Sequence, residues 1–266
     1  MITIQNYVQP QSLEEAYELN QKKRNRIVGG MLWLKTSNIT IPTAIDLSAL
    51  GLDTIEESEE SFSIGAMVTL RQLEKHAGLN AYSQGVIAKA VEDIVGVQFR
   101  NMATVGGSIF GRFGFSDVMT VFLSMDTYVE LYKGGIIPLE EFAKLKKDRD
   151  ILVRIIVRKV PGAFTYHAMR NSRTDFPALT CAVSQLSGEY RTVIGARPAL
   201  ARVLRDNSGI LSHGINETSA HSFAEYAAKS IPTSGNIRGS AAYRTHLIRV
   251  LTERALLELG GTNHGN

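Results

Sequence analysis

The chain has 266 residues, of which 44% are hydrophobic and 21% charged, a composition typical of a soluble globular protein with a substantial core. Its formal net charge is only +3, and acidic residues are interspersed among the Lys and Arg residues. A charge this small argues against nucleic acid as the main partner, and the length favours two domains.

The amino-terminal residues Met1–Asn6 show no basic region followed by an apolar stretch, and no segment reaches the roughly 20 apolar residues that span a bilayer. We therefore expect a cytoplasmic protein without a membrane span. Cys181 is the only cysteine, which excludes an internal disulfide and an iron–sulfur cluster held by this chain alone. The six histidines are scattered, with no two of them four residues apart, so no metal site is expected.

Local signals in the first part of the chain predict a mixture of helices and short strands. Ser12 and Glu15 form a capping box, in which each side chain accepts from an exposed amide, and this box begins a helix through Leu19. The acidic residues at 56–60 are interpreted as a turn. Strands are predicted at 26–28, 43–47 and 62–68, and helices at 70–76 and 84–95.

After a glycine-rich segment, the pattern becomes richer in strands. Residues 151–160 are β-branched and interrupted by arginines, which favours a strand that crosses between two domains, and Gly134-Gly135 is interpreted as a turn. A helix is predicted at 118–125, strands at 128–132, 164–169, 178–186 and 190–196, and helices at 219–230 and 240–259. The expected fold class is α+β, with a domain boundary near residue 160.

Two basic runs stand out in the charge pattern. The first contains Lys22, Lys23, Arg24 and Arg26, and the second contains Lys144, Lys146 and Lys147. Both are interpreted as solvated surface at the end of a helix.

Two diglycines follow predicted strands, in Ile27-Val-Gly-Gly-Met31 and in Ala103-Thr-Val-Gly-Gly-Ser108. A diglycine allows consecutive amides to turn toward one anion, because no side chain blocks its approach, so two such loops can hold one diphosphate. Neither matches the Gly-x-Gly-x-x-Gly or Gly-Lys-Ser patterns of other nucleotide-binding loops. The alternative for each diglycine alone is an ordinary turn or bulge.

Four ordered motifs carry a resemblance that spans almost the whole chain. They are Val28-Gly-Gly-Met-Leu-Trp33, Arg100-Asn-Met-Ala-Thr-Val-Gly-Gly-Ser108, Ser116-Asp117 followed by Phe122-Leu-Ser-Met-Asp126, and Arg238-Gly-Ser-Ala-Ala-Tyr-Arg-Thr-His-Leu247. The chain resembles the FAD-binding medium subunit of the molybdenum hydroxylases, which include xanthine dehydrogenase and carbon monoxide dehydrogenase. The resemblance implies a p-cresol methylhydroxylase-type FAD-binding domain of two α/β subdomains over 1–160. A smaller antiparallel sheet with helices follows at 161–266, as in the carbon monoxide dehydrogenase flavoprotein.

The resemblance also implies which residues bind FAD. Amides of Val28–Trp33 and Thr104–Ser108 hold the diphosphate and ribityl chain, and Asp117 accepts hydrogen bonds from flavin hydroxyls, although it also suits a helix N-cap. His167 faces the pyrimidine edge or is an ordinary strand histidine. The full predicted set is Ile27, Val28, Gly29, Gly30, Met31, Leu32, Trp33, Ile94, Thr104, Val105, Gly106, Gly107, Ser108, Ser116, Asp117, Ile151, Leu152 and His167.

Two segments depart from the family pattern. Met31 and Leu32 replace the usual Thr and Asp, which removes side-chain hydrogen bonds from the first loop and predicts weaker binding. The run Phe110-Gly-Arg-Phe-Gly-Phe115 replaces an Ala-Ser-Pro-rich stretch. Its aromatic and cationic side chains either stack on the flavin or pack as an ordinary loop.

In function, the resemblance implies an oxidoreductase subunit with FAD, an iron–sulfur subunit and a molybdopterin subunit as partners, and NAD⁺ or another molecule as electron acceptor. FAD carries the redox chemistry, so no catalytic acid or base is expected, and the sequence shows no convincing catalytic constellation. One alternative is a stand-alone flavin oxidase or reductase of the same fold, against which the appended carboxy-terminal sheet argues. The other is a non-enzymatic scaffold subunit that has lost flavin. The substrate of the complex stays open.

Overall fold

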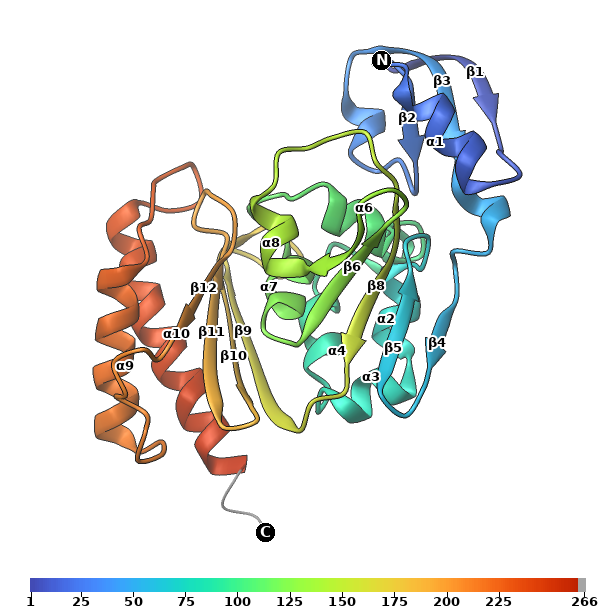
Figure 1. Ribbon diagram of the computed structural model, residues 1–266. Coiled ribbons are helices and arrows are strands. Elements are labelled where there is room, and N and C mark those ends of the chain that lie inside the picture. The colour runs from blue at the N-terminus through green and yellow to red at the C-terminus, as the bar shows by residue number, and fades with distance from the viewer. Residues whose placement is uncertain (263–266) are drawn as a thin grey trace. The chain divides into compact units, whose positions relative to one another are not determined.

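The computed structural model describes residues 1–262, which form two compact units (Figure 1). Unit 1 combines residues 1–73, 96–111 and 127–158, and unit 2 combines 74–95, 112–126 and the chain from residue 159 onward. Each unit therefore joins segments that are far apart in the sequence. The domain boundary near residue 160 stays a prediction, since unit 2 takes residues from both sides of it.

A three-stranded parallel sheet forms the amino-terminal part of unit 1. It has the order β1-β3-β2 and consists of β1 (Thr3–Val8), β2 (Arg26–Val28) and β3 (Thr40–Asp46), with α1 (Leu13–Gln21) between β1 and β2 in the chain. As predicted, the Ser12 hydroxyl caps α1 by accepting from the Glu15 amide at 3.1 Å. The Glu15 carboxylate accepts from the Gln11 amide at 2.8 Å rather than from that of Ser12, so the capping box is displaced by one residue.

A five-stranded antiparallel sheet forms the rest of unit 1. Its order is β4-β5-β8-β6-β7, with β4 (Ile55–Glu57), β5 (Ser61–Gly65), β6 (Thr127–Leu131), β7 (Gly135–Pro138) and β8 (Leu152–Arg158). The strand predicted at 151–160 is shorter: β8 ends at Arg158 in unit 1, and the chain enters unit 2 at residue 159, so the crossing between domains stays a prediction. The arginines of β8 pair along the sheet, Arg154 with Glu130 at 2.9 Å and Arg158 over the Tyr128 ring at 4.3 Å. The predicted turn at Gly134-Gly135 is confirmed, with φ +67° at Gly135.

Short helices complete unit 1, and one of them corrects the sequence analysis. The second diglycine lies inside helix α6 (Val105–Phe110) rather than in a turn. Thr104 caps this helix by accepting from the Gly107 amide at 3.1 Å. The others are η1 (Leu34–Thr36), η2 (Leu47–Leu50), α5 (Val97–Arg100), α8 (Leu139–Lys144) and the first part of α2 (Leu70–Lys75).

Unit 2 is built on a four-stranded antiparallel sheet with the order β12-β11-β10-β9. The strands are β9 (Gly162–Arg170), β10 (Pro177–Leu186), β11 (Glu189–Gly195) and β12 (Arg202–Arg205), and the first three confirm predicted strands. Neighbouring residues of β10 face different helices. The Thr180 hydroxyl lies 3.0 Å from that of Thr120 in α7 (Asp117–Leu123), and Cys181 Sγ lies 3.8 Å from the Thr252 hydroxyl in α10 (Ala241–Thr262). Helices therefore cover both faces of the sheet.

The helices of unit 2 largely follow the predicted segments. They are α3 (Ala77–Tyr82), α4 (Val86–Val91), α7 (Asp117–Leu123), α9 (Glu217–Ser230) and α10 (Ala241–Thr262), with α9 and α10 lying together on one side of the sheet (Figure 1). The helix predicted at 84–95 is shorter, since Gln84 and Gly85 have φ +54° and +79° and separate α3 from α4. Across residues 1–262, no helix combines the length and hydropathy needed to cross a membrane.

Candidate functional site

The two glycine segments of unit 1 are packed directly against each other. A Cβ added to Gly30 would lie 1.9 Å from the carbonyl oxygen of Met102, and one added to Gly29 would lie 2.7 Å from the Thr104 hydroxyl oxygen. Both glycines are therefore required by contact between the segments, in addition to any contact with a ligand. The two glycine segments, far apart in sequence, are therefore in direct contact, and their common role in cofactor binding stays a prediction.

The first loop presents a run of unused main-chain donors. Within residues 1–262, the amides of Gly29, Gly30, Met31 and Leu32 donate no hydrogen bond, and these residues are exposed or half-buried. Met31 has φ +56°, a left-handed conformation that costs a non-glycine residue about 1–2 kcal/mol. Consecutive donors beside a strained residue are typical of an anion-binding loop.

The departure at Met31 has a packing explanation. Its side chain packs against the buried residues Val28, Ile41 and Ala44. The methionine thus anchors the loop to the parallel sheet, where a threonine would instead present a hydroxyl. The loop keeps its main-chain donors and loses the side-chain ones, as the sequence predicts.

The amides of the second segment are already engaged. The Thr104 hydroxyl oxygen accepts from Gly107, and its carbonyl accepts from Ser108 at 3.1 Å. The amides of Val105 and Gly106 donate to Val68 O and Ala66 O, both at 2.8 Å. These groups hold α6 in place and support the first loop, and a role of the amides from Val105 to Ser108 in holding a diphosphate stays a prediction.

Several of the predicted apolar site residues are buried in unit 1, and Ile27 is half-buried. Ile151 is fully buried in a cluster with Ala16 and Val153, and Ile27 packs on the edge of that cluster. Val28 and Leu152 are also buried. Their side chains support the strands that lead to the loop, whereas Trp33 is 41% exposed and meets the Phe99 ring edge-on with centroids 6.0 Å apart.

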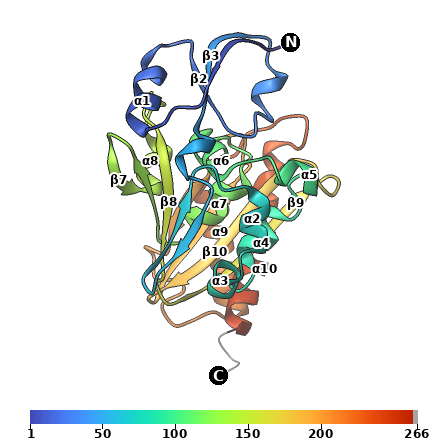
Figure 2. The same ribbon diagram turned by 90° about the vertical axis from the view of Figure 1, so that its right-hand side faces the viewer.

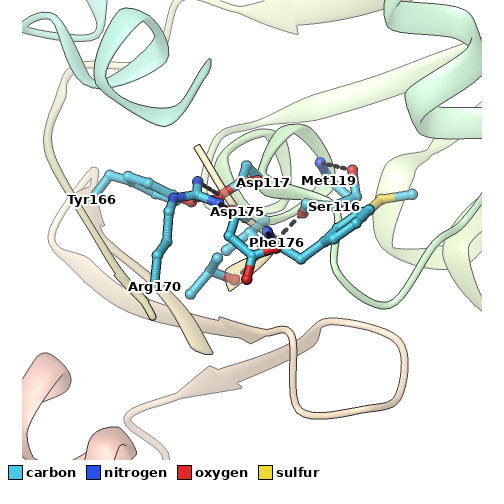
Figure 3. Close-up of polar contacts among 9 residues, drawn as sticks. Ser116, Asp117, Met119, Tyr166, Arg170, Asp175 and Phe176 are labelled. Atoms are coloured by element: carbon cyan, nitrogen blue, oxygen red, sulfur yellow. Dashed lines mark hydrogen bonds and ion pairs between the residues drawn. The ribbon is translucent and has the colours of Figure 1, made fainter. Parts of the chain in front are cut away.

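Asp117 lies in unit 2 at the start of α7. Ser116, not Asp117, caps this helix, since its hydroxyl accepts from the Met119 amide at 3.0 Å. The N-cap interpretation of Asp117 is therefore wrong. The Asp117 side chain is buried, and its Oδ1 accepts from the Tyr166 hydroxyl and from the Arg170 guanidinium, both at 2.5 Å (Figure 3).

Burial and charge compete at this carboxylate. Burial raises the pKa of Asp117, while the Arg170 charge and the hydrogen bonds from Tyr166 and Arg170 act to lower it. Burial, together with the neighbouring Asp117 carboxylate, raises the pKa of Tyr166 well above the usual value. Tyr166 therefore stays a hydrogen-bond donor, and the Asp117 carboxylate is fixed in one orientation by two donors on the same strand.

Sequence analysis missed Tyr166 and Arg170. The available signal was their spacing of four, which places both side chains on one face of β9, but the strand predicted at 164–169 ended one residue before Arg170. His167 lies on the other face, where its Nε2 contacts Glu258 Oε2 at 2.7 Å. Burial and the nearby Lys89 lower the pKa of His167. The structure does not bring His167 and Asp117 together, and Ile94 lies beyond the end of α4, half-buried.

A chain of polar contacts continues from Asp117 along the β9–β10 connection. The Arg170 guanidinium also donates to the Asp175 carbonyl at 2.8 Å, and the Asp175 carboxylate pairs with Arg238 at 3.3 Å. The Arg238 guanidinium lies 4.7 Å from the centre of the Phe176 ring. Figure 3 shows Asp175 and Phe176 beside the Asp117 cluster.

This chain of contacts ends at a cavity of about 450 Å³ within unit 2. Phe115 meets Phe176 edge-on with centroids 4.5 Å apart and stacks on Phe113 at 5.2 Å, so these aromatic residues pack with one another. Aromatic walls with two guanidinium groups suit a planar ligand that carries negative charge. The lining residues are Arg112, Gly114, Phe115, Phe176, Pro177, Ala196, Pro198, Ala199, Leu200, Asn236 and Arg238.

Comparison with known families decides the identity of the fold. The family described as the FAD binding domain in molybdopterin dehydrogenase matches residues 2–161. The chain belongs to this family.

Individual relatives in this FAD-binding family agree over nearly the full length. The Escherichia coli K12 protein YgfM, described as uncharacterized, is 24% identical, and the match covers 93% of each chain. The nicotine 6-hydroxylase medium subunit of Paenarthrobacter nicotinovorans is 25% identical, with 96% of each chain covered. A chain of carbon monoxide dehydrogenase from Hydrogenophaga pseudoflava superposes with a TM-score of 0.86 at 22% identity and 97% coverage of each chain, which confirms the α+β fold.

FAD is the cofactor of this family, and the residues present fit it. The open amides of Gly29–Leu32 match the oxygens of a diphosphate, and no side chain of the two glycines blocks the approach. The Asp117 carboxylate is a buried hydrogen-bond acceptor within unit 2. Within residues 1–262, no group of His, Cys, Asp and Glu side chains is placed to hold a metal ion.

Proposed function

We propose that this chain is the electron-transfer subunit of a molybdenum hydroxylase-type complex. Electrons from iron–sulfur clusters of a partner subunit reach NAD⁺ or another acceptor by way of bound FAD. The row of unused amides at Gly29–Leu32 carries the proposal, because consecutive main-chain donors beside obligatory glycines suit an anionic cofactor. The family match and the nicotine 6-hydroxylase medium subunit support it.

The residues of this chain bind and orient the cofactor. Amides of the first loop bind the diphosphate, with α6 as the platform beneath them. Asp117 accepts a hydrogen bond from the flavin part, and Tyr166 and Arg170 keep its carboxylate in place. When bound, FAD supplies the redox chemistry by accepting electrons and releasing them as a hydride, so no catalytic acid or base of this chain is required.

We place the acceptor in the cavity of unit 2. A nucleotide such as NAD⁺ offers planar rings to Phe115 and Phe176 and phosphates to Arg112 and Arg238. The contacts from Asp117 through Arg170 and Asp175 to Arg238 support this placement, because they connect the flavin-binding carboxylate to the cavity wall. An acceptor of this kind makes the chain xanthine dehydrogenase-like.

The test is purification of the full chain followed by flavin analysis and anaerobic titration. We expect a yellow protein with about one FAD per chain that is bleached by NADH. Arg238→Met should keep FAD but slow bleaching at least about tenfold, whereas Arg202→Met, an exposed arginine on β12, should bleach normally.

Each contrary outcome has a clear meaning. A colourless protein that takes up no added FAD would favour the scaffold alternative. Turnover of a small substrate by this chain without partner subunits would favour the stand-alone enzyme. If the wild-type chain contains about one FAD but is not bleached by NADH, NAD⁺ is excluded as the electron acceptor and another molecule takes that role.

A further inference from the structure

The two basic runs of the sequence meet in unit 1. The segment at 20–26 contains the last two residues of α1 and the chain that follows them, and the segment at 145–149 precedes β8. Figures 1 and 2 both place α1 beside the chain that leads into β8. Arg149 joins the segments, because its guanidinium donates to the carbonyls of Asn20, Lys22 at 3.0 Å, Lys23 at 3.2 Å and Asn25 at 2.9 Å.

These two segments carry more positive charge than the net charge of the whole protein. We call their seven cations the basic face: Lys22, Lys23, Arg24, Arg26, Lys146, Lys147 and Arg149. Asp148 is the only acid in the two segments. The segments contain seven of the 29 basic and one of the 26 acidic residues, which leaves 22 basic and 25 acidic residues elsewhere. The rest of the chain is therefore net negative, although the whole chain carries +3.

Few contacts within the chain neutralise the basic face. Lys22, Lys23, Arg24 and Lys146 are exposed, and within residues 1–262 no carboxylate lies within 4 Å of their charged groups. Gathering like charges within a Debye length of roughly 8 Å is unfavourable. The Arg149 hydrogen bonds hold the segments together against this repulsion, so an oppositely charged partner would be favoured at this face.

The basic face borders both glycine segments. Arg26 begins β2, the strand that runs into Gly29-Gly30. Lys147 Nζ donates to the carbonyl of Gly111 at 2.7 Å, and Gly111 is the residue that ends α6. A molecule bound on the basic face would thus lie beside the loops that bind the cofactor.

We propose that the basic face is the docking surface for an acidic face of the electron-donating iron–sulfur subunit. This inference rests on the proposed function. A protein partner is favoured over nucleic acid or membrane because Leu145, 50% exposed, offers an apolar contact among the cations. The net negative charge of the remaining chain would also repel an extended polyanion.

The experiment uses the full FAD-loaded chain and the purified iron–sulfur subunit, with affinity measured at 50, 150 and 500 mM salt. The test variant is Lys23→Glu/Arg24→Glu/Lys146→Glu. Of the three replaced residues, only Lys23 accepts a hydrogen bond from Arg149, and it does so through its main-chain carbonyl. The replacements therefore leave the Arg149 hydrogen bonds in place. The matched control, Lys75→Glu/Arg202→Glu/Lys229→Glu, changes three exposed cations elsewhere by the same total charge.

We expect the test variant to bind at least about tenfold more weakly at 150 mM salt and the control to stay within about twofold of wild type. Equal affinity of test variant and wild type would overturn the proposal while leaving the proposed function intact. Tighter binding of wild type to a DNA duplex or to phosphatidylserine vesicles than to the subunit would also overturn it. No binding of the subunit to FAD-loaded wild type would overturn both. If the test variant loses FAD, Lys23→Gln/Arg24→Gln/Lys146→Gln takes its place, with the same affinity loss expected.

Discussion

The contact between Gly30 and Met102 makes the first loop sensitive to a single methyl group. In Gly30→Ala, the new Cβ would lie 1.9 Å from the Met102 carbonyl oxygen and 2.5 Å from its carbon. Carbon atoms in proteins approach oxygen to no less than roughly 3 Å, so the loops must separate by about 1 Å. No rotamer change relieves this clash, because the opposing atoms belong to the backbone.

The expected loss of folding stability follows from overpacking, because the added methyl group enters space that the Met102 backbone already occupies. Such changes cost about 1–3 kcal/mol, and each kcal/mol lowers the Tm of a protein of this size by roughly 2–4 °C. We therefore expect the Tm of Gly30→Ala to fall by about 2–12 °C. Moving the amides of Gly30 and Met31 weakens hydrogen bonds to a charged group worth about 1.5–3 kcal/mol each, so FAD affinity should fall at least tenfold.

The assays are thermal unfolding followed by circular dichroism and FAD titration followed by flavin fluorescence. Gly261→Ala is the matched control, because a Cβ at this position of α10 meets no atom within 4 Å and alanine favours a helix. Its Tm should rise slightly, with FAD binding unchanged. A Gly30→Ala protein that melts within about 1 °C of wild type and binds FAD equally well would refute the loop-packing argument.

Two further predictions concern buried titratable groups. Because burial raises the pKa of Asp117, the folded state keeps the proton to a higher pH than the unfolded state, and stability falls as pH rises above the usual 3.8. Arg170→Met removes the charge that lowers this pKa, so its Tm should fall more steeply than that of wild type as the pH rises above 3.8. Adding Asp117→Asn to Arg170→Met should flatten the dependence of Tm on pH, because the titrating carboxyl is removed. The same dependence of Tm on pH in Arg170→Met and wild type would contradict the ion pair between Asp117 and Arg170. Burial raises the pKa of Cys181 to about 12, so Ellman's reagent at pH 8 should react only after urea unfolds the chain, and rapid native reaction would argue against burial.

Local signals were sufficient for elements whose residues interact with near neighbours. The Ser12 cap of α1 and the apolar strands of the carboxy-terminal sheet follow from capping and strand propensity. The strand β1 escaped prediction because its residues are almost all exposed and show no alternation of burial. It exists through pairing with β3, more than thirty residues away in the sequence.

The candidate site also combines features that the sequence specifies with features that only the tertiary structure specifies. The sequence by itself determined the glycines of both segments and the family, because these depend on residue type and order, and it predicted a role for Asp117 in binding flavin. Only the tertiary structure decided that the amides at Gly29–Leu32 stay open while those at Val105–Ser108 are used, and that Tyr166 and Arg170 hold Asp117. The physical reason is that a hydrogen bond depends on which groups the fold brings within about 3 Å, and residues distant in sequence supply several of these partners.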